Sequence, residues 1–246
     1  MISVIIPVKD AERLIKRCCD SVFNVCNDMV EIVVVDYNST DNTKEEVCGW
    51  NKSNVRYIEI DKAGIYYAMN IGIKLAKNEY LYFMGADDYL LPGFKDAIGT
   101  VKNDEKLISV FKVGGLIGDE EVSYKDKTSV KKLFRFSRGR FFSPNQQAII
   151  YNKKCFDLYG DFDERYQLVA DADHFLRCID AGISAISFYG TYIAAVGKDG
   201  ASSDFLKVWA ENLLITSRGS RRPSQSNFIF DGIVSLLRYW VREIKK

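Results

Sequence analysis

Histidine is almost absent from this chain of 246 residues, which carries a single one, His174. The 6 cysteines form no CxxC pair and lie at positions 18, 19, 26, 48, 155 and 178. With one histidine and no such pair, we expect that no His/Cys zinc site can be assembled. We interpret the cysteines instead as reduced, mostly buried thiols of a cytosolic protein.

The chain also lacks an excess of charge, because 34 basic and 33 acidic side chains leave a formal net charge of +1. A protein that binds nucleic acid by neutralising phosphates needs a basic excess, so no nucleic-acid partner is expected. No stretch reaches the ~20 apolar residues of a membrane span. The apolar start, residues 2–8, has no basic leader and is too short for a signal peptide.

Glycine-rich phosphate loops are missing as well. No GxGxxG follows the first apolar run and no GxxxxGK(S/T) occurs anywhere in the chain. Ordinary dehydrogenases and P-loop enzymes are therefore disfavoured. A sugar nucleotidyltransferase would share a nucleotide-binding α/β sheet, but it would need a basic, glycine-rich loop after the first strand. Residues 9–12 read KDAE, which is not such a loop.

What the chain does contain is an alternation of apolar runs and helical patterns. Apolar residues make up 47% of it, which is enough for one large domain or a domain with an appendage. Strands that are almost wholly apolar and alternate with helices indicate a parallel sheet covered on both faces. We predict such strands over 2–8, 31–36, 55–60 and 80–84, and helices over 11–26, from 43, and over 65–76.

The pattern is less regular beyond Pro92. The charged stretch 124–140 is predicted as a loop or a helix, and the glycine- and serine-rich stretch 197–203 as a flexible loop. Regular elements are predicted again further on: helices over 152–159, 171–181 and 204–217, and strands over 183–189 and 192–196.

Acidic residues stand at the ends of two predicted strands. Asp36 ends the second strand, and Asp87 and Asp88 follow the fourth. Ligands bind at the carboxyl ends of parallel strands, where a lone aspartate can accept from a base or a ribose hydroxyl. Paired carboxylates are hard ligands suited to Mg²⁺ or Mn²⁺. The structural alternatives are a solvated pair that opens a turn, and an Asp36 that caps the turn at residues 38–39.

A third acidic group opens the helix predicted over 171–181. Asp171 at the start of a helix can act as a general base for an incoming hydroxyl group. The alternative is that Asp171 only caps the helix, with Asp173 interacting favourably with the helix dipole. We interpret His174 as a partly buried helix residue rather than as a metal ligand or a base.

Together these stretches resemble the family 2 glycosyltransferases. The order and spacing of the motifs match over about residues 1–203, which is far more specific than any single motif. The matching stretches are SVIIPVKD at 3–10, EIVVVDYNSTDNT at 31–43, DKAGIYYAMNIGI at 61–73, ADD at 86–88, QQAIIY at 146–151, FDERY at 162–166 and ADAD at 170–173.

The resemblance implies a GT-A fold, a Rossmann-like and mostly parallel sheet flanked by helices. It divides the chain into a GT-A domain at 1–203 and a C-terminal helical extension at 204–246. The implied activity is inverting transfer of a hexosyl or N-acetylhexosaminyl group from a nucleotide sugar, usually UDP-linked. The implied acceptor is a hydroxyl of a glycan or of a lipid-linked saccharide in polysaccharide biosynthesis, such as O-antigen assembly.

The resemblance also assigns roles to individual residues. The nucleotide base is framed by Pro7, Val8 and Asp36, and the nucleotide-sugar side is lined by Lys62, Gly64 and Asn70. The ribose or sugar is held by Asp87, and Mn²⁺ or Mg²⁺ is bound by Asp88. The catalytic base is Asp171.

The chain departs from the family pattern at a few positions. Asp10 replaces an asparagine and Tyr67 an aspartate, while Gln146 stands where a histidine is usual. Tyr37 and Asn38 replace an acidic residue and a glycine. We expect the changes at Asp10, Tyr37 and Asn38 to tune base binding rather than to abolish it.

The end of the chain, residues 226–246, has the pattern of an amphipathic helix with Arg238, Arg242 and Lys245 on the polar face. Basic residues beside Trp240 and Tyr239 suit an anionic membrane surface, which would place the protein peripherally on the inner face of the cytoplasmic membrane. A lipid-linked acceptor, such as a polyprenyl-diphosphate saccharide, would fit that location. The alternative is a helix that packs on the domain or on a second subunit of a homodimer.

A second function remains open at this point. A non-catalytic member of the family would bind a nucleotide sugar or act as a scaffold without transferring anything. The presence of all four acidic residues, Asp36, Asp87, Asp88 and Asp171, argues against such a degenerate protein.

Overall fold

The structure is a computed structural model that describes residues 1–117, 121–123, 136–137, 140–141, 143–197 and 205–218. Its centre is a 9-stranded sheet. The first part of this sheet is parallel and has the order β3-β2-β1-β4. Its strands are β1 (Ile2–Val8), β2 (Val30–Tyr37), β3 (Val55–Ile60) and β4 (Tyr80–Phe83). Every residue of β1 and β4 is buried, which agrees with their apolar sequences.

The sheet continues beyond β4 with mixed strand directions, as expected of a sheet that is mostly rather than wholly parallel. β10 (Ile149–Asn152) runs antiparallel to β4 and to β6 (Ile108–Ile117). β6 then pairs in parallel with β11 (Ile186–Val196), which pairs antiparallel with β5 (Tyr89–Leu90). The remaining short strands are β7 (Glu121–Ser123), paired with β6, and the separate pair β8 (Phe136–Ser137) and β9 (Arg140–Phe141).

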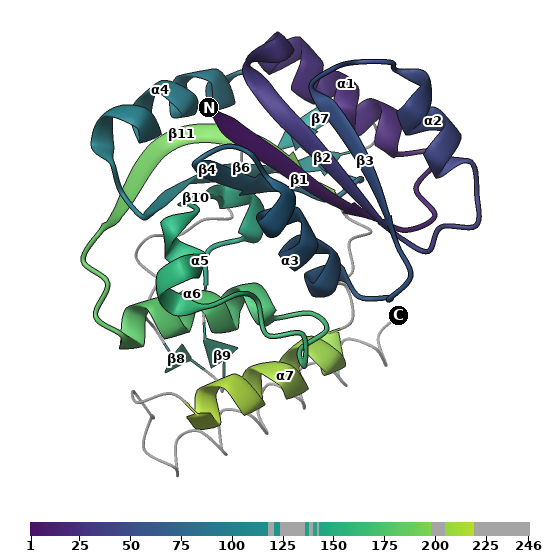
Figure 1. The fold of residues 1–246 in the computed structure, drawn as a ribbon. Helices are drawn as coiled ribbons and strands as arrows, with labels where there is room; N and C mark the ends of the chain where they lie inside the picture. The colour runs from purple at the N-terminus through teal and green to yellow at the C-terminus, as the bar shows by residue number, and fades with distance from the viewer. Residues whose placement is uncertain (118–120, 124–135, 138–139, 142, 198–204, 219–246) are drawn as a thin grey trace.

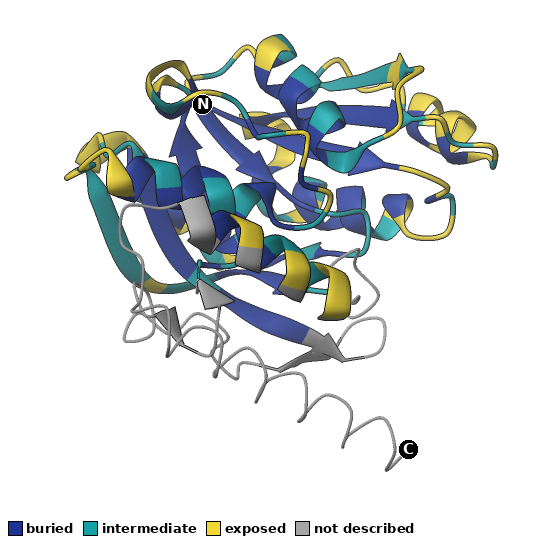
Figure 2. Ribbon diagram, turned by 90° about the horizontal axis from the view of Figure 1, so that it is seen from below, coloured by how far each residue is buried: buried dark blue, intermediate teal, exposed yellow. Residues whose placement is uncertain are grey.

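Helices cover both faces of the sheet (Figure 1). One group lies above it in that view: α1 (Ile15–Cys26), α2 (Thr43–Gly49) and α4 (Gly93–Asp104). The other group lies below: α3 (Ile65–Leu75), α5 (Lys154–Tyr159) and α6 (Ala170–Asp180). Short 3₁₀ turns are η1 (Asn27–Met29) and η3 (Gln146–Ala148). Seen from below, the buried strands form the centre of the molecule and exposed residues lie on the helices and loops (Figure 2).

Two elements differ from the sequence-based expectation. α4 was not predicted, because Pro92 and Gly93 suggest a turn while they in fact start a helix whose buried residues include Phe94 and Val101. The strands predicted over 183–189 and 192–196 are one strand, β11. Its pairing with β6 is irregular between Phe188 and Ala194, so the apolar pattern is interrupted although the strand is continuous.

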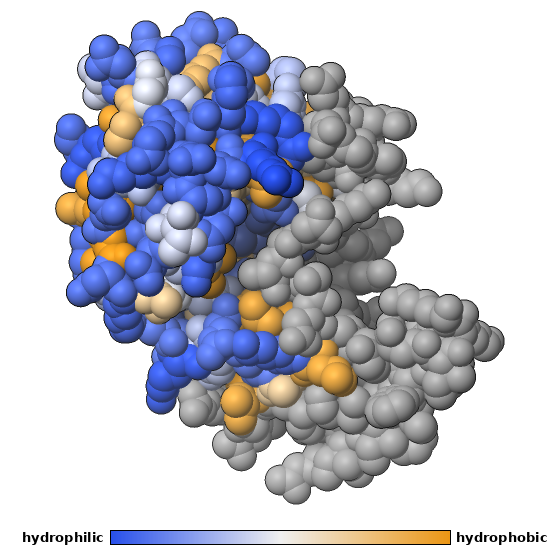
Figure 3. All heavy atoms as spheres, turned by 90° about the vertical axis from the view of Figure 1, so that its right-hand side faces the viewer, coloured by the Kyte–Doolittle hydropathy of each residue, from blue (hydrophilic) through white to orange (hydrophobic). Residues whose placement is uncertain are grey.

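The helix predicted over 204–217 is confirmed as α7 (Phe205–Arg218). Its Glu211 carboxylate accepts hydrogen bonds from the backbone N–H groups of Gln167 (2.9 Å) and Leu168 (2.9 Å), just before α6. In Figure 3 the upper part of the molecule is mainly hydrophilic, and apolar side chains gather lower down, near α7. Among the described helices, none combines the length and the apolar character that a membrane crossing requires. The amphipathic helix predicted at 226–246 lies outside the described residues.

Candidate active site

Several predicted site residues lie at the carboxyl edge of the parallel strands. Val8, at the end of β1, pairs in register with Asp36 on β2. On the other side of β1, Phe83 ends β4 and leads through residues 84–86 to Asp87 and Asp88. Because β2, β1 and β4 are parallel neighbours, the two acidic groups flank the end of β1. This is the edge at which open α/β sheets bind ligands.

Asp36 is only 1% exposed and is held by two donors. Its Oδ2 accepts from the Tyr57 hydroxyl at 2.6 Å and its Oδ1 from the Ser39 N–H at 2.8 Å. The pKa of Tyr57 is raised, by burial and then by this bond to Asp36. Asp36 therefore does cap the turn at Ser39, as the structural alternative expected. Each oxygen keeps a second lone pair, so the same carboxylate can also accept from a base.

Asp88 is buried, with 1% exposure, and it organises the loop after β4. Its Oδ2 accepts from the Gly85 N–H at 2.6 Å and from the Gln147 amide at 2.9 Å, and its Oδ1 accepts from the Gly197 N–H at 3.1 Å. Three segments that are distant in sequence thus meet on one carboxylate. Both lone pairs of Oδ2 are used and one lone pair of Oδ1 remains.

Asp87 lies next to Asp88 and is only half-buried. Its backbone carbonyl accepts from the Arg17 guanidinium at 3.0 Å. Within the described part of the chain, no ion pair joins either carboxylate to a lysine or arginine side chain. Burial, and then repulsion from Asp87, raise the pKa of Asp88 from an ordinary value of 3.8 to about 7. Two close carboxylates that repel each other are suited to a divalent metal.

Asp171 is brought to the same edge by a contact between helices. α3 begins at Ile65, soon after β3 ends at Ile60, so its first turn lies at the carboxyl edge of the sheet. Tyr66 is in that turn, and its hydroxyl donates to Asp171 Oδ1 at 2.8 Å. Burial raises the pKa of Asp171, and the bond from Tyr66 acts in the opposite direction. The N-cap of α6 is Val169, so Asp171 is not the capping residue.

The residues predicted for the nucleotide-sugar side lie around the start of α3. Lys62 pairs with Glu164 at 2.5 Å, and its ammonium group lies 4.2 Å from the centre of the Tyr67 ring. Gly64 is the N-cap of α3 with φ of 140°, a conformation that favours glycine. The buried Asn70 side chain exchanges hydrogen bonds with the Phe162 backbone, at 2.9 and 3.0 Å. These contacts give Asn70 a positioning role, and its predicted contact with a donor remains a prediction.

Sequence reasoning missed three residues of this site. Gln147, in the stretch QQAIIY, donates a hydrogen bond to Asp88. Tyr66, in the stretch DKAGIYYAMNIGI, donates a hydrogen bond to Asp171. Gly197 was placed in a loop by composition, yet its N–H contacts Asp88. Only the tertiary structure shows which acidic residue each of them supports.

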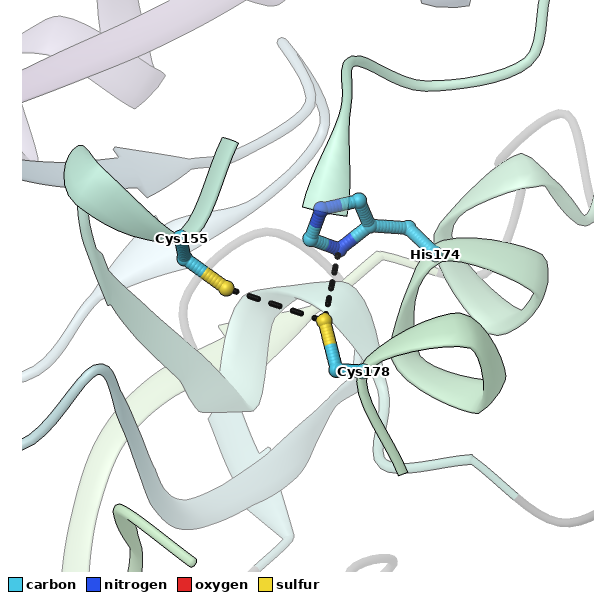
Figure 4. Close-up of side chains that lie close together, drawn as sticks. All are labelled: Cys155, His174 and Cys178. Carbon is cyan, nitrogen blue, oxygen red and sulfur yellow. Dashed lines mark hydrogen bonds between the residues drawn. The ribbon is translucent and has the colours of Figure 1, made fainter. Parts of the chain in front are cut away.

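The expectation that no His/Cys set can be assembled is wrong. Cys155, His174 and Cys178 are all buried, and their potential ligand atoms lie within 4.8 Å of one another (Figure 4). His174 is fully rather than partly buried. The cysteines are mostly buried, as expected: all six are free thiols, and Cys48 is the exposed one.

Replacing Gly197 by alanine should disturb the acidic pair. A Cβ at this position would lie 2.7 Å from Asp87 Cγ and 2.8 Å from the Asp87 backbone oxygen, which cannot move without shifting the loop. Overpacking of this kind costs about 1–3 kcal/mol. We expect Gly197→Ala to lower the free energy of unfolding by that amount in urea titrations and to weaken Mn²⁺ binding in calorimetry. Gly190→Ala is the matched control, because a Cβ there meets nothing within 4 Å; equal effects of both substitutions would contradict this explanation.

The protein thus has an α/β fold of the GT-A type, with acidic residues at the carboxyl edge of its parallel strands. A family model described as Glycosyl transferase family 2 matches residues 3–158. That is more than half of the 246 residues, so the chain belongs to the family 2 glycosyltransferases. The family resemblance seen in the sequence is thereby confirmed.

Individual proteins similar to this chain carry related descriptions. A PGL/p-HBAD biosynthesis glycosyltransferase of Mycobacterium bovis (strain BCG / Pasteur 1173P2) is 28% identical over 262 residues, which cover 100% of this chain and 93% of the relative. A poly(ribitol-phosphate) beta-glucosyltransferase of Bacillus spizizenii is 38% identical over 95 residues, covering 36% of this chain and 15% of the relative.

Among solved structures, S. aureus TarS 1–349 in complex with UDP-GlcNAc superimposes with a TM-score of 0.68 at 21% identity. The match covers 89% of this chain and 67% of the TarS chain. Against another TarS structure, the chain spans 36% of that chain's length. At this identity the likeness establishes the fold, and the predicted GT-A fold is confirmed.

Proposed function

We propose that this glycosyltransferase is an inverting enzyme that moves a sugar from a UDP-linked donor to a hydroxyl group of a saccharide acceptor. The observation that carries the proposal is the bond between Tyr66 and Asp171. It brings a half-buried carboxylate to the sheet edge that also bears Asp36, Asp87 and Asp88. An acidic pair for a metal and diphosphate, and a separate carboxylate for the attacking alcohol, are the groups that single-displacement transfer requires.

The nucleotide is assigned to the end of β1. Pro7 and Val8 are buried there, and Val8 pairs in register with Asp36, whose carboxylate retains lone pairs. A uracil ring offers an N–H donor that such a carboxylate can accept. The complex of the structurally similar TarS with UDP-GlcNAc supports a UDP-linked donor. Lys62, with its ammonium group beside Tyr67, is the basic residue closest in sequence to the start of α3 and is assigned to the donor's phosphate side.

The acidic pair fits a divalent cation. Among the described residues, none donates a side-chain hydrogen bond to the Asp87 carboxylate, and Asp88 Oδ1 keeps one lone pair. We therefore assign Mn²⁺ or Mg²⁺ to both residues together. The prediction that Asp88 alone binds the metal is not tested by this geometry, and the hydrogen bonds favour a ligand set that includes Asp87. A bound metal would neutralise the developing charge of the leaving diphosphate.

Asp171 is assigned the role of general base. As the acceptor oxygen forms a bond to the anomeric carbon, its proton passes to Asp171 and the bond from that carbon to the diphosphate oxygen breaks. Attack from the face opposite to the leaving group inverts the anomeric centre. The raised pKa of Asp171 improves its match to a proton released near neutral pH.

For the acceptor, we propose a glycan or a lipid-linked saccharide in polysaccharide biosynthesis, with a hexosyl or N-acetylhexosaminyl group transferred. The descriptions of the relatives support this class, since they name a PGL/p-HBAD biosynthesis glycosyltransferase and a poly(ribitol-phosphate) beta-glucosyltransferase. Attachment to the inner face of the cytoplasmic membrane, or dimerisation, through residues 226–246 stays a prediction.

The test is a panel of UDP-sugars incubated with the protein and Mn²⁺, read out as binding by calorimetry and as UDP release. We expect at least one sugar nucleotide to bind and to release UDP, with release lost in Asp171→Asn and binding retained. Binding without UDP release in the wild type, across saccharide and lipid-linked acceptors, would instead favour the non-catalytic family member. If no nucleotide sugar binds, the proposal fails.

Metal binding should depend on pH because of Asp88. Its folded-state pKa of about 7 exceeds its ordinary value of 3.8, so without metal the folded protein holds a proton that the unfolded chain has lost. The metal-free protein therefore loses stability as the pH rises through this window. Since a metal binds the carboxylate form, Mn²⁺ affinity should rise about tenfold per pH unit up to roughly pH 7 and then level off. Calorimetric Mn²⁺ titrations between pH 5.5 and 8.5 measure this, and a flat affinity below pH 7 would rule it out.

A further inference from the structure

We propose that Cys155, His174 and Cys178 form a second metal site, specific for a thiophilic d¹⁰ cation and best suited to Zn²⁺. This site is separate from the acidic pair in both position and chemistry. The hard carboxylates of Asp87 and Asp88 suit Mn²⁺ or Mg²⁺, whereas thiolates and imidazole select zinc or monovalent copper.

The three ligands come from two neighbouring helices. His174 and Cys178 are four residues apart on α6, so they lie on the same side of that helix, and Cys155 faces them from α5 (Figure 4). All three side chains are 0% exposed. Two ligands spaced by one helical turn and a third from an adjacent helix form a three-residue binding face.

The distances agree with a single bound ion. Cys155 Sγ lies 3.7 Å from Cys178 Sγ, which in turn lies 3.8 Å from His174 Nδ1. Two sulfurs at ~2.3 Å from one tetrahedral zinc ion lie ~3.8 Å apart, and a sulfur and an imidazole nitrogen lie ~3.6 Å apart. All three potential ligand atoms lie within 4.8 Å of one another, so Cys155 and His174 must approach each other by at most about 1 Å to share one Zn²⁺.

The imidazole ring is already fixed in the orientation that ligation requires. It stacks on Phe156 with the ring centres 4.6 Å apart, and it makes edge contacts with Tyr151 at 5.7 Å and Phe162 at 5.4 Å. These rings hold Nδ1 toward the sulfur of Cys178. Fixed ligand orientation is what a metal site needs in order to be selective.

The polar atoms around this cluster make few hydrogen bonds to the described residues. Among the described residues, His174 Nε2 and the Tyr151 hydroxyl are buried and have no hydrogen-bond partner. The contacts between the thiols and the imidazole are themselves weak hydrogen bonds. A cation bound by the two sulfurs and Nδ1 would replace these weak contacts with metal–ligand bonds.

Charge favours zinc over monovalent copper. Two thiolates and a neutral imidazole carry a charge of −2, which Zn²⁺ cancels and Cu⁺ does not. The surrounding side chains include Phe83, Phe156 and Phe162, and a neutral complex is preferred in such an apolar environment. On binding, each of the two thiols releases its proton, so one Zn²⁺ displaces two protons from the protein.

Because the site is fully buried, the ion must enter as the chain folds. The test is to refold the full chain in a phosphine reductant with one equivalent of Zn²⁺, Cu⁺ or no metal, and to measure retained metal by atomic emission after treatment with EDTA. We expect about one retained zinc per chain, less copper, and a higher unfolding temperature with zinc. Refolding with Co²⁺ should give thiolate-to-cobalt charge-transfer absorption bands, which the acidic pair cannot produce.

Matched serine variants locate the ion. Cys155→Ser and Cys178→Ser should lose the retained zinc and the thiolate–cobalt bands, whereas Cys26→Ser, also buried but on α1, should keep both. Asp87→Asn should keep them as well, which separates this site from the acidic pair. The proposal is overturned if the wild type retains no zinc and shows no thiolate–cobalt bands, if preferential copper retention is found, or if the Cys155→Ser/Cys178→Ser double variant retains zinc. A metal-free protein two hydrogens lighter, indicating a disulfide, would overturn it too.

Discussion

Asp171→Asn is expected to reduce kcat for sugar transfer by ~10³-fold while leaving donor binding almost unchanged, since positioned general bases contribute roughly 10²–10⁴-fold. The amide cannot accept the acceptor's proton, but it retains the size of the carboxylate beside Tyr66. The measurement is steady-state UDP release together with calorimetric binding of the donor. A loss confined to kcat is the signature of a group that acts in the transition state.

Two further variants make this result specific. Asp157→Asn, an exposed aspartate in the first turn of α5, serves as the matched control and should remain fully active. Tyr66→Phe removes the hydrogen bond that holds the pKa of Asp171 down, so the acidic limb of the pH–rate profile should move to higher pH. If Asp171→Asn turns over at the wild-type rate, another group must be the base.

Removal of the metal is expected to have the next largest effect. We predict that EDTA, or Asp87→Asn, lowers kcat by ~10²–10³-fold, because stabilisation of the leaving group's charge is lost. Added Mn²⁺ should restore the EDTA-treated wild type and fail to restore Asp87→Asn at the same concentration. UDP release across a Mn²⁺ titration measures both. Asp96→Asn, an exposed aspartate on α4, is the control that should behave as wild type.

Asp88→Asn should give a different result from Asp87→Asn. The Asp88 carboxylate accepts N–H bonds from Gly85, Gln147 and Gly197, and an asparagine side chain has only one accepting oxygen. At least one of these donors then loses its partner, at a cost of about 1–3 kcal/mol. Asp88→Asn should therefore lose both activity and stability, whereas Asp87→Asn loses activity alone. Equal stability of the two variants in urea unfolding would argue against the organising role of Asp88.

The first half of the fold is readily predicted from the sequence, because its strands are almost wholly apolar and alternate with helices. That pattern gives a parallel sheet, and a parallel sheet places Asp36, Asp87 and Asp88 at one edge. The prediction of the fold fails where the spacing of apolar residues no longer determines which strands pair. Nothing in the sequence of β10 indicates that it runs antiparallel between β4 and β6. The start of α4 is also missed, because the sequence Pro92-Gly93 is typical of a turn.

The acidic residues of the site can be predicted from the sequence, but the residues that hydrogen-bond to them cannot. A carboxylate at a strand end has a local signal, whereas the partners of Asp88 and Asp171 come from segments distant in sequence, such as Gln147 and Tyr66. The cluster of Cys155, His174 and Cys178 escaped prediction because its members do not have the short spacing of zinc motifs; the packing of α5 against α6 brings them together.

The carboxylate of Glu211 has a consequence for where the catalytic unit ends. It accepts hydrogen bonds from the N–H groups of Gln167 and Leu168, the segment that leads into α6. These bonds fix the start of α6 and hence the position of Asp171. A truncated protein that stops at residue 203 would lose these bonds, although every acidic residue of the site would still be present. We therefore expect the shortest active fragment to include the helix from Phe205 to Arg218 rather than to stop before it.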